Sequence, residues 1–383
     1  MLWRFRRVGV LALAVGLAAP GVEAIPWRRA VAAGHDQVLT PGLPGHGWIL
    51  FDLRGRGAVR GGDFHLQFNT ETVTVALEGV RLGARVELTA ALRVEALYAG
   101  ILPDYIVRGD RTTARGFWAS YGDAFVAVKW LIGGPHIVEG LAGGRRWRFD
   151  RRAGVTLDSL VLPEDSWVFA PRLRYTFWAA RNAAREWGAE VAFPRWEGLA
   201  AGVELGLDVR DVRAPWGGVE GSPSSRNTPG AVIVMARQWL RAGRRLGPRA
   251  RLGVEQNASW GRGEDDLTRP RIGGLNPFVV GLPGVPWASL LSERFVAAQA
   301  GVYVRPSEAS AHEFGLAVGG GAFSDPLRTG QLGRFGGALG VMLHADLRWG
   351  RWQGYARVGW GAPVGPFEGA LRLSAMLGAG ASF

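Results

Sequence analysis

The chain of 383 residues contains no cysteine, and Lys129 is its only lysine. Without cysteine there are no disulfides, no thiolate metal sites and no lipid-modified N-terminal cysteine. After residue 24 there is also no apolar run near the ~20 residues that a membrane-spanning helix needs. The net charge of +12 comes almost entirely from arginine. Together with 58 glycines, this preference for arginine indicates a GC-rich genome. The chain lacks a basic cluster with interleaved aromatic residues, so its charge does not indicate nucleic-acid binding.

The first residues have the three parts of a secretory signal peptide. A start with three arginines is followed by an apolar run over 8–19 and by a small-residue cleavage site ending at Ala24. We therefore expect 1–24 to be a cleaved signal peptide and 25–47 to be a short periplasmic N-terminal extension.

What is abundant instead is alternation with a period of two residues. In the segment 84–98, apolar residues from Val86 to Ala96 occupy every second position, with charged residues or threonine between most of them. A helix would spread these apolar residues around its circumference, whereas a strand places them on one side. The periodicity predicts a strand, although the residue types favour a helix.

The same alternation recurs along the chain. Candidate strands lie near 48–54, 63–70, 72–82, 84–98, 117–131, 145–157, 167–178, 186–193, 199–213, 231–241, 247–260, 293–305, 312–323, 337–349, 352–361 and 369–383. Scattered pairs such as Gly143-Gly144 are interpreted as turns. We expect an all-β fold, a transmembrane antiparallel β-barrel of about 16 strands over 48–383. A closed barrel can cross a membrane without helices because every backbone N–H and C=O is hydrogen-bonded between strands. A soluble β-sandwich is the alternative.

One hairpin predicts its own register. If Trp349 pairs with Trp352 across Gly350-Arg351, the apolar residues of both strands fall on one face. The opposite face, expected to line the lumen, carries His344, Asp346, Arg348 and Arg357. On the apolar face, Trp352 and Trp360 would lie about 20 Å apart along the membrane normal, which is typical of two aromatic girdles.

The C-terminal segment alternates and ends in Phe383. It resembles the assembly signal of outer-membrane barrels, with Leu377, Ala379, Ala381 and Phe383 on one face, although such signals often carry another aromatic residue at the position of Ala381. If Phe383 lies at the periplasmic rim, short turns fall on the periplasmic side and long connections such as 261–292 on the outer side.

The long connection 261–292 resembles a lumenal loop of the surface-antigen superfamily, which includes the outer-membrane assembly insertase and two-partner secretion pores. The resemblance, which extends over roughly the last 120 residues, rests on Arg271, Gly273, Gly274, Phe278, Gly281, Glu293 and Arg294, and on GAFSDP at 321–326. It implies a loop that enters the lumen and occludes it. An ordinary pore-constricting or surface loop is the alternative. Val280 and Leu282 replace the arginine and the aromatic residue of the family's motif, so Arg271 is the candidate for the arginine's role.

The family members also carry periplasmic POTRA domains, for which 25–47 leaves no room. The resemblance implies transport, or protein or lipid handling, at the outer membrane of a Gram-negative bacterium. Its expected mechanism is a weakly paired seam between the first strand and 369–383. Expected partners are outer-membrane lipid, lipopolysaccharide and the barrel assembly machinery.

Two other functions remain open. One is a passive, anion-preferring diffusion porin. The other is a hydrolase that uses His344 and Asp346, although a charge-balanced polar lumen explains these residues more simply. Asp265-Asp266 in the long loop is expected to be solvated. No catalytic site, metal site or cofactor is predicted.

Overall fold

The structure is a computed structural model that describes 27–39, 46–69, 72–99, 117–151, 153–154, 156–179, 197–212, 214–217, 230–265, 267–272, 275, 282–284, 290–324, 335–364 and 372–382. Its strands are β1 (Trp27–Val38), β2 (His46–Val59), β3 (Gly62–Asn69), β4 (Thr72–Arg81), β5 (Val86–Ala99), β6 (Phe117–Gly133), β7 (His136–Arg151), β8 (Ser166–Phe169), β9 (Arg172–Trp178), β10 (Gly198–Arg210), β11 (Val232–Arg245), β12 (Ala250–Arg262), β13 (Arg271–Ile272), β14 (Leu290–Leu291), β15 (Arg294–Val304), β16 (Glu313–Ser324), β17 (Phe335–Trp349), β18 (Trp352–Val364) and β19 (Arg372–Ser382). Within these described ranges, no helix has the length and hydropathy that a membrane crossing requires.

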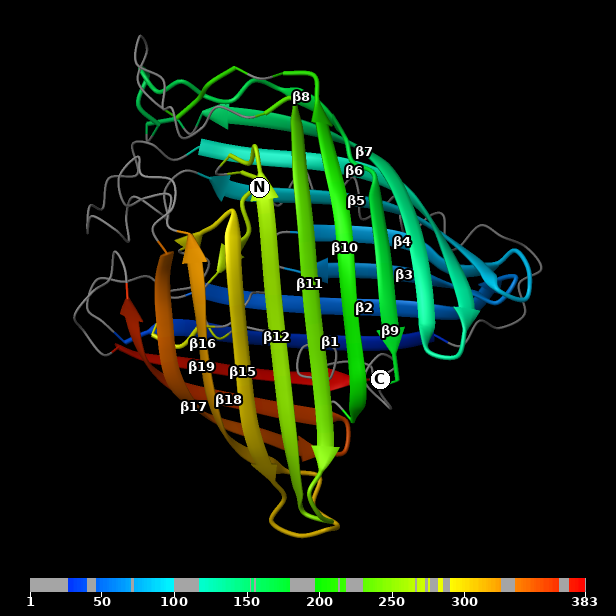
Figure 1. The fold of residues 1–383 in the computed structure, drawn as a ribbon, viewed down its shortest axis with the longest axis vertical. Coiled ribbons are helices and arrows are strands. Elements are labelled where there is room, and N and C mark those ends of the chain that lie inside the picture. The colour runs from blue at the N-terminus through cyan, green and yellow to red at the C-terminus, as the bar shows by residue number, and fades with distance from the viewer. Residues whose placement is uncertain are drawn as a thin grey trace.

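All strands except β13 and β14 form one antiparallel sheet that closes on itself (Figure 1). β8 and β9 share one place in the wall, because both pair with β7 on one side and β10 on the other. The wall therefore has sixteen places, and the predicted closed barrel of about 16 strands is confirmed.

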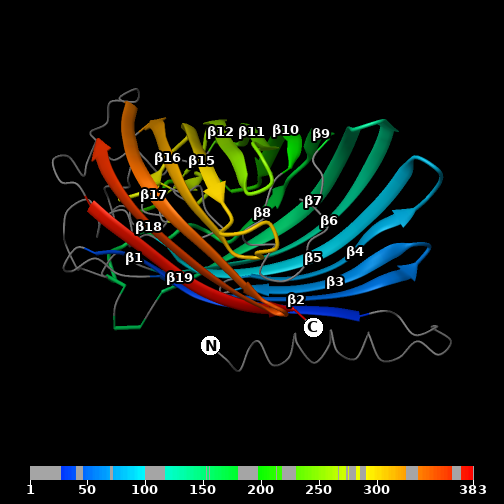
Figure 2. The same cartoon turned by 90° about the horizontal axis from the view of Figure 1, so that it is seen from below.

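The barrel closes differently from the expectation. β1 occupies part of the range expected to be a periplasmic extension, and it pairs with β19 over nine residues, from Ala30↔Ser382 to Val38↔Ser374. Figure 2 shows the two strands side by side, in dark blue and red. The expected weak seam, with 48–54 as the first strand, is therefore wrong. Phe383 and the signal peptide 1–24 lie outside the described residues.

Two further differences concern the start of β7 and the segment between β9 and β10. β7 begins at His136 rather than near 145, and it contains Gly143-Gly144, which we had interpreted as a turn. The segment 186–193, a predicted strand, lies outside the described residues. β9 pairs directly with β10, so no strand separates these two.

The predicted register of the last hairpin is confirmed. Trp349 pairs with Trp352, His344 with Arg357 and Val341 with Trp360. Many large apolar residues of the strands face outward. They remain exposed, as in Leu92 at 61%, Trp352 at 61% and Leu377 at 63%. The outer wall is therefore apolar, and the alternate positions point into the lumen.

The lumen contains charged side chains joined in ion pairs. Asp123 contacts both Arg93, at 2.6 Å, and Arg145, at 3.3 Å. On the opposite wall, Arg251 binds Glu313 at 2.5 Å. Because each charge has a partner of opposite sign close by, the desolvation of these groups is partly offset.

Candidate functional site: the lumenal loop and its bed

The connection between β12 and β15, residues 263–293, is the lumenal loop. Its root is fixed at Asp265, which is 0% exposed. The Asp265 carboxylate accepts hydrogen bonds from Arg210 Nη1 at 2.9 Å and from Trp216 Nε1 at 3.1 Å. Thr268 Oγ1 adds a third at 2.8 Å. Our expectation of a solvated Asp265 is therefore wrong.

The electrostatics of the root follow from these contacts. Burial alone would raise the pKa of Asp265, but the charge and hydrogen bonds of Arg210, with those of Thr268 and Trp216, outweigh it and lower the pKa. The carboxylate is thus ionised and holds the loop to β10. Asp266 lies outside the described residues.

The neighbouring Glu264 is in the opposite situation. It is 3% exposed, and among the described residues neither carboxyl oxygen has a hydrogen-bond partner. Burial raises its pKa to about 8, opposed by Arg237 and Arg269 and assisted by Glu293. A buried carboxyl without partners is costly in its charged form, so the site favours the protonated acid.

The tip of the loop reaches the inner wall at Leu275, which is 1% exposed. Its backbone N–H donates to Asp36 Oδ2 on β1 at 2.7 Å. Its carbonyl oxygen accepts from Arg357 Nη1 on β18 at 3.1 Å. The Leu275 side chain packs in an apolar cluster that includes Trp48 and Met376. The main chain of one residue is thereby tethered to two strands on either side of β19.

A second contact ties the loop to the last strand. Gly284 N–H donates to Ser374 Oγ on β19 at 2.7 Å. The loop therefore contacts β1, β18 and β19 together and lies across the closing seam from the lumenal side.

Small residues on the inner wall make room for the loop. A Cβ added at Gly361 would overlap the carbonyl oxygen of Pro283, and one at Gly340 would lie 2.8 Å from Pro283 Cβ. Gly359 is similarly close, at 3.1 Å. The approaches at Gly361 and Gly340 are closer than side-chain packing permits, and that at Gly359 is tight. These three glycines, called the glycine bed, therefore make room for the loop at Pro283.

The expected lumen-facing residues lie on the inner wall. Asp346 accepts from Gln353 Nε2 at 2.9 Å and contacts Arg348 at 3.3 Å. His344 packs edge-on against Tyr303, with ring centroids 5.6 Å apart. Of the four expected residues, Arg357 contacts the loop through Leu275.

The expected loop motif is described only in part. Gly273, Gly274, Phe278 and Gly281 lie outside the described residues, and Arg271 is described only as the backbone of β13. Glu293 pairs with Arg269 at 3.2 Å at the root. Arg294 points outward over the Trp260 ring, 6.0 Å from its centroid.

The expected assembly signal lies on β19. Leu377 faces outward, and Ala379 and Ala381 share its face of the strand. Ala381 itself is buried, between Val31 of β1 and Trp352 of β18.

Sequence reasoning missed the tethering residues Asp36 and Ser374, because neither belongs to a motif. It also missed a buried cluster in which His65 contacts Asp52 at 3.2 Å and Glu78 at 2.9 Å. In the part of the chain that the structure describes, no group of three or more His, Asp or Glu side chains is arranged to hold a metal ion.

No protein-family model and no curated protein matches the chain. Solved structures do match. The structure of BamA from Haemophilus ducreyi lacking POTRA domains 1–3 has a TM-score of 0.59 at 10% identity, over 93% of this chain and 70% of that one. CdiB from Acinetobacter baumannii has a TM-score of 0.60 at 10% identity, covering 93% of this chain and 60% of that one. CdiB from Escherichia coli gives 0.57 at 11%, covering 95% and 64%. The barrel therefore resembles those of BamA and CdiB in fold.

Proposed function

We propose that the chain is an outer-membrane transport barrel of the surface-antigen type, whose lumenal loop closes the lumen and moves to admit cargo. The observation that carries this proposal is the tethering of Leu275 and Gly284 to three wall strands. The bonds to Asp36 and Arg357 involve charged groups, each worth about 1.5–3 kcal/mol net.

The apolar outer wall supports a membrane location. Exposed aromatic and aliphatic residues continue around the barrel, including Trp130 at 59% and Leu339 at 70%. A water-soluble monomer rarely exposes contiguous apolar surface on this scale, whereas lipid is a suitable solvent for it. The shared fold with BamA and CdiB supports the outer membrane in particular.

The moving part in this proposal is the loop rather than the seam. Sideways opening would break the nine-residue pairing of β1 with β19. Release of the loop breaks the hydrogen bonds of Leu275 and Gly284 to the wall and exposes the apolar cluster around Leu275. The cargo class that fits the surface-antigen resemblance is polypeptide or lipid.

Planar-bilayer conductance tests the proposal. We would compare the natural chain with a variant in which 275–284 is replaced by a short glycine-serine linker. The natural chain is expected to conduct little and intermittently, and the variant steadily. A steady, anion-selective current in the natural chain, unchanged by the replacement, would instead indicate a passive diffusion porin.

We also propose that His344 and Asp346 are structural. The Asp346 carboxylate is engaged by Arg348 and Gln353, and His344 by the Tyr303 ring. The natural chain and His344→Ala should show the same background turnover of ester and peptide substrates. Turnover by the natural chain that His344→Ala abolishes, while the barrel keeps its heat-modifiable gel mobility, would support the hydrolase alternative.

A further inference from the structure

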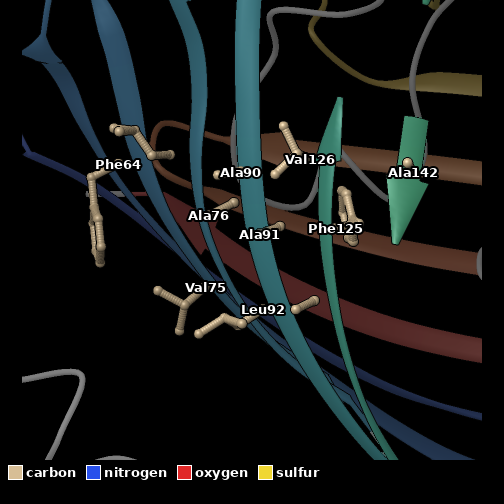
Figure 3. Close-up of a pocket in the computed structure, with 11 residues that line it drawn as sticks. Phe64, Val75, Ala76, Ala90, Ala91, Leu92, Phe125, Val126 and Ala142 are labelled. Carbon is tan, nitrogen blue, oxygen red and sulfur yellow. The ribbon is translucent and has the colours of Figure 1, made fainter. Parts of the chain in front are cut away.

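The outer wall over β3–β7 is hollowed by an apolar groove of about 450 Å³. In Figure 3 its labelled side chains extend from Phe64 on one side of the view to Ala142 on the other, with Ala90 between them. The pairing places two adjacent rows of residues on this outward face. They are Phe64–Leu77–Ala90–Val126–Ala142 and Leu66–Val75–Leu92–Ala124–Gly144. In both rows the residues on β3 and β4 are larger, and the small residues Ala142 and Gly144 lie on β7.

The groove continues along β7 as a trench, whose floor consists of glycine and alanine residues. The outward positions of β7 are Gly140, Ala142 and Gly144, and a Cβ added at either glycine would meet nothing within 4 Å. The strands on either side carry tall apolar residues, such as Val126, 49% exposed, and Leu173, 54% exposed. The result is a narrow apolar channel parallel to the strand.

At one end of the trench stand two outward arginines. Arg146 continues the row of floor residues and stacks on the outward Trp167, 5.2 Å from its ring centroid. Arg148 follows two residues later on the same face. Neither forms an ion pair with any carboxylate of the described residues. An outward arginine at the rim of the apolar band extends toward the lipid headgroups, so an anionic headgroup lies within its reach.

The arginines lie toward the end of the barrel at which the lumenal loop begins, because β7 and β12 run in the same direction. From Ala142 to Arg146 is four residues, or about 13 Å along the strand. This spacing matches a lipid whose phosphate contacts the arginines and whose acyl chain extends toward the middle of the membrane.

We propose that the β7 trench binds one acyl chain of a phosphorylated, multiply acylated lipid of the outer leaflet, and that Arg146 and Arg148 bind its phosphate. This inference rests on the membrane placement in the proposed function, but not on movement of the loop. A flexible alkyl chain suits the trench because its floor is smooth and its walls carry no polar partners.

The test is lipid retention in nanodiscs that contain phosphatidylcholine with a small fraction of lipid A, measured by native mass spectrometry. The natural chain should retain lipid A at a saturable stoichiometry near one. Ala142→Phe fills the trench, and Arg146→Gln with Arg148→Gln removes the charge. The arginine changes should lower retention by about ten-fold or more, since a hydrogen bond to a charged group is worth at least one such factor. Ala142→Phe should also lower retention, because its ring occupies the place of the acyl chain.

Two variants elsewhere on the outer wall are matched controls. Ala345→Phe adds the same ring on β17, where Ala345 pairs with Phe314 and Ala356. Arg294→Gln removes an outward arginine that also stacks on a tryptophan, Trp260. Both should retain lipid A as the natural chain does.

Equal retention in all variants would overturn the inference. So would equal retention by the natural chain of lipid A and of phosphatidylglycerol, measured in parallel nanodiscs in which phosphatidylglycerol replaces lipid A, because the lipid would then be ordinary boundary lipid. A chain that enters nanodiscs but binds no lipid A refutes this inference alone. A chain that does not enter them refutes the membrane placement as well.

Discussion

At the scale of single residues, the closure of the lumen depends on side chains that bind main-chain groups. Leu275 offers one N–H and one carbonyl, and Asp36 and Arg357 satisfy them. A buried main-chain group without a partner costs about 1–3 kcal/mol, so each of these side chains matters more than an exposed one of the same type.

Asp36→Ala should therefore weaken the docked loop. The Leu275 N–H loses its acceptor in a buried place, and a loss of about 1.5–3 kcal/mol corresponds to a rise of roughly ten-fold or more in the undocked population. The open time in bilayer recordings measures this rise. Asp36→Asn, which keeps an acceptor oxygen, should show a smaller effect. Identical open times in all three proteins would show that the tether does not close the lumen.

The second prediction at this scale concerns pH. The pKa of Glu264 is about 8 in the docked loop, against 4.5 for an exposed glutamate. Docking is thus favoured most below pH 4.5, weakens as the pH rises toward 8, and changes no further above it. At 1.36 kcal/mol per pKa unit, the whole effect amounts to at most about 5 kcal/mol.

Glu264→Gln should abolish most of this dependence, because glutamine is neutral at every pH. Open times of the natural chain should lengthen between pH 5 and about 8, whereas those of the variant should stay short. Glu308→Gln, in the exposed β15–β16 connection, should behave like the natural chain. A pH response that survives in Glu264→Gln would assign it to another group.

At the scale of elements, the glycine bed on β17 and β18 determines whether the loop fits. Gly361→Ala would place a methyl group where the Pro283 carbonyl oxygen lies, and backbone cannot move aside as a flexible side chain can. The variant should fold as a barrel with its loop displaced, giving steady conductance and faster proteolysis within 263–293.

Gly140→Ala is the matched control, since its new methyl group would meet nothing within 4 Å. It should leave conductance and proteolysis unchanged. If Gly361→Ala also leaves both unchanged, the loop does not occupy the bed in the membrane.

Sequence patterns predicted some elements well and others poorly, for physical reasons. The β17–β18 register was predictable because a two-residue turn leaves one pairing that keeps the apolar faces together. β1 was missed because its outward face mixes Val31 with His35 and Gln37, so it shows no alternation. The strand predicted for β7 was too short, because the glycines at 143 and 144 resemble turn residues. In the structure Gly144 lies in the trench and Gly143 lies close to β6.

At the scale of the whole molecule, the barrel was predictable and the closure of its lumen was not. The barrel follows from alternation repeated along the chain. The bond between Asp36 and Leu275 joins residues 239 positions apart and involves the main chain of one of them, so no sequence pattern marks it. The resemblance to surface-antigen loops predicted that the loop enters the lumen, and it placed the candidate anchoring arginine, Arg271, in the loop itself. The structure supplies Arg357 from the wall.

The central claim is that lipid surrounds one face of every strand and the lumen the other. Because the chain has no cysteine, single cysteines can be placed along β17 at the outward Leu339, Val341 and Leu343 and at the inward Met342, His344 and Asp346. Each would carry a fluorophore in bilayers that contain nitroxide-labelled lipid. We predict strong quenching at the outward positions and little at the inward ones. Equal quenching at both sets, or none at the outward set, would contradict the account.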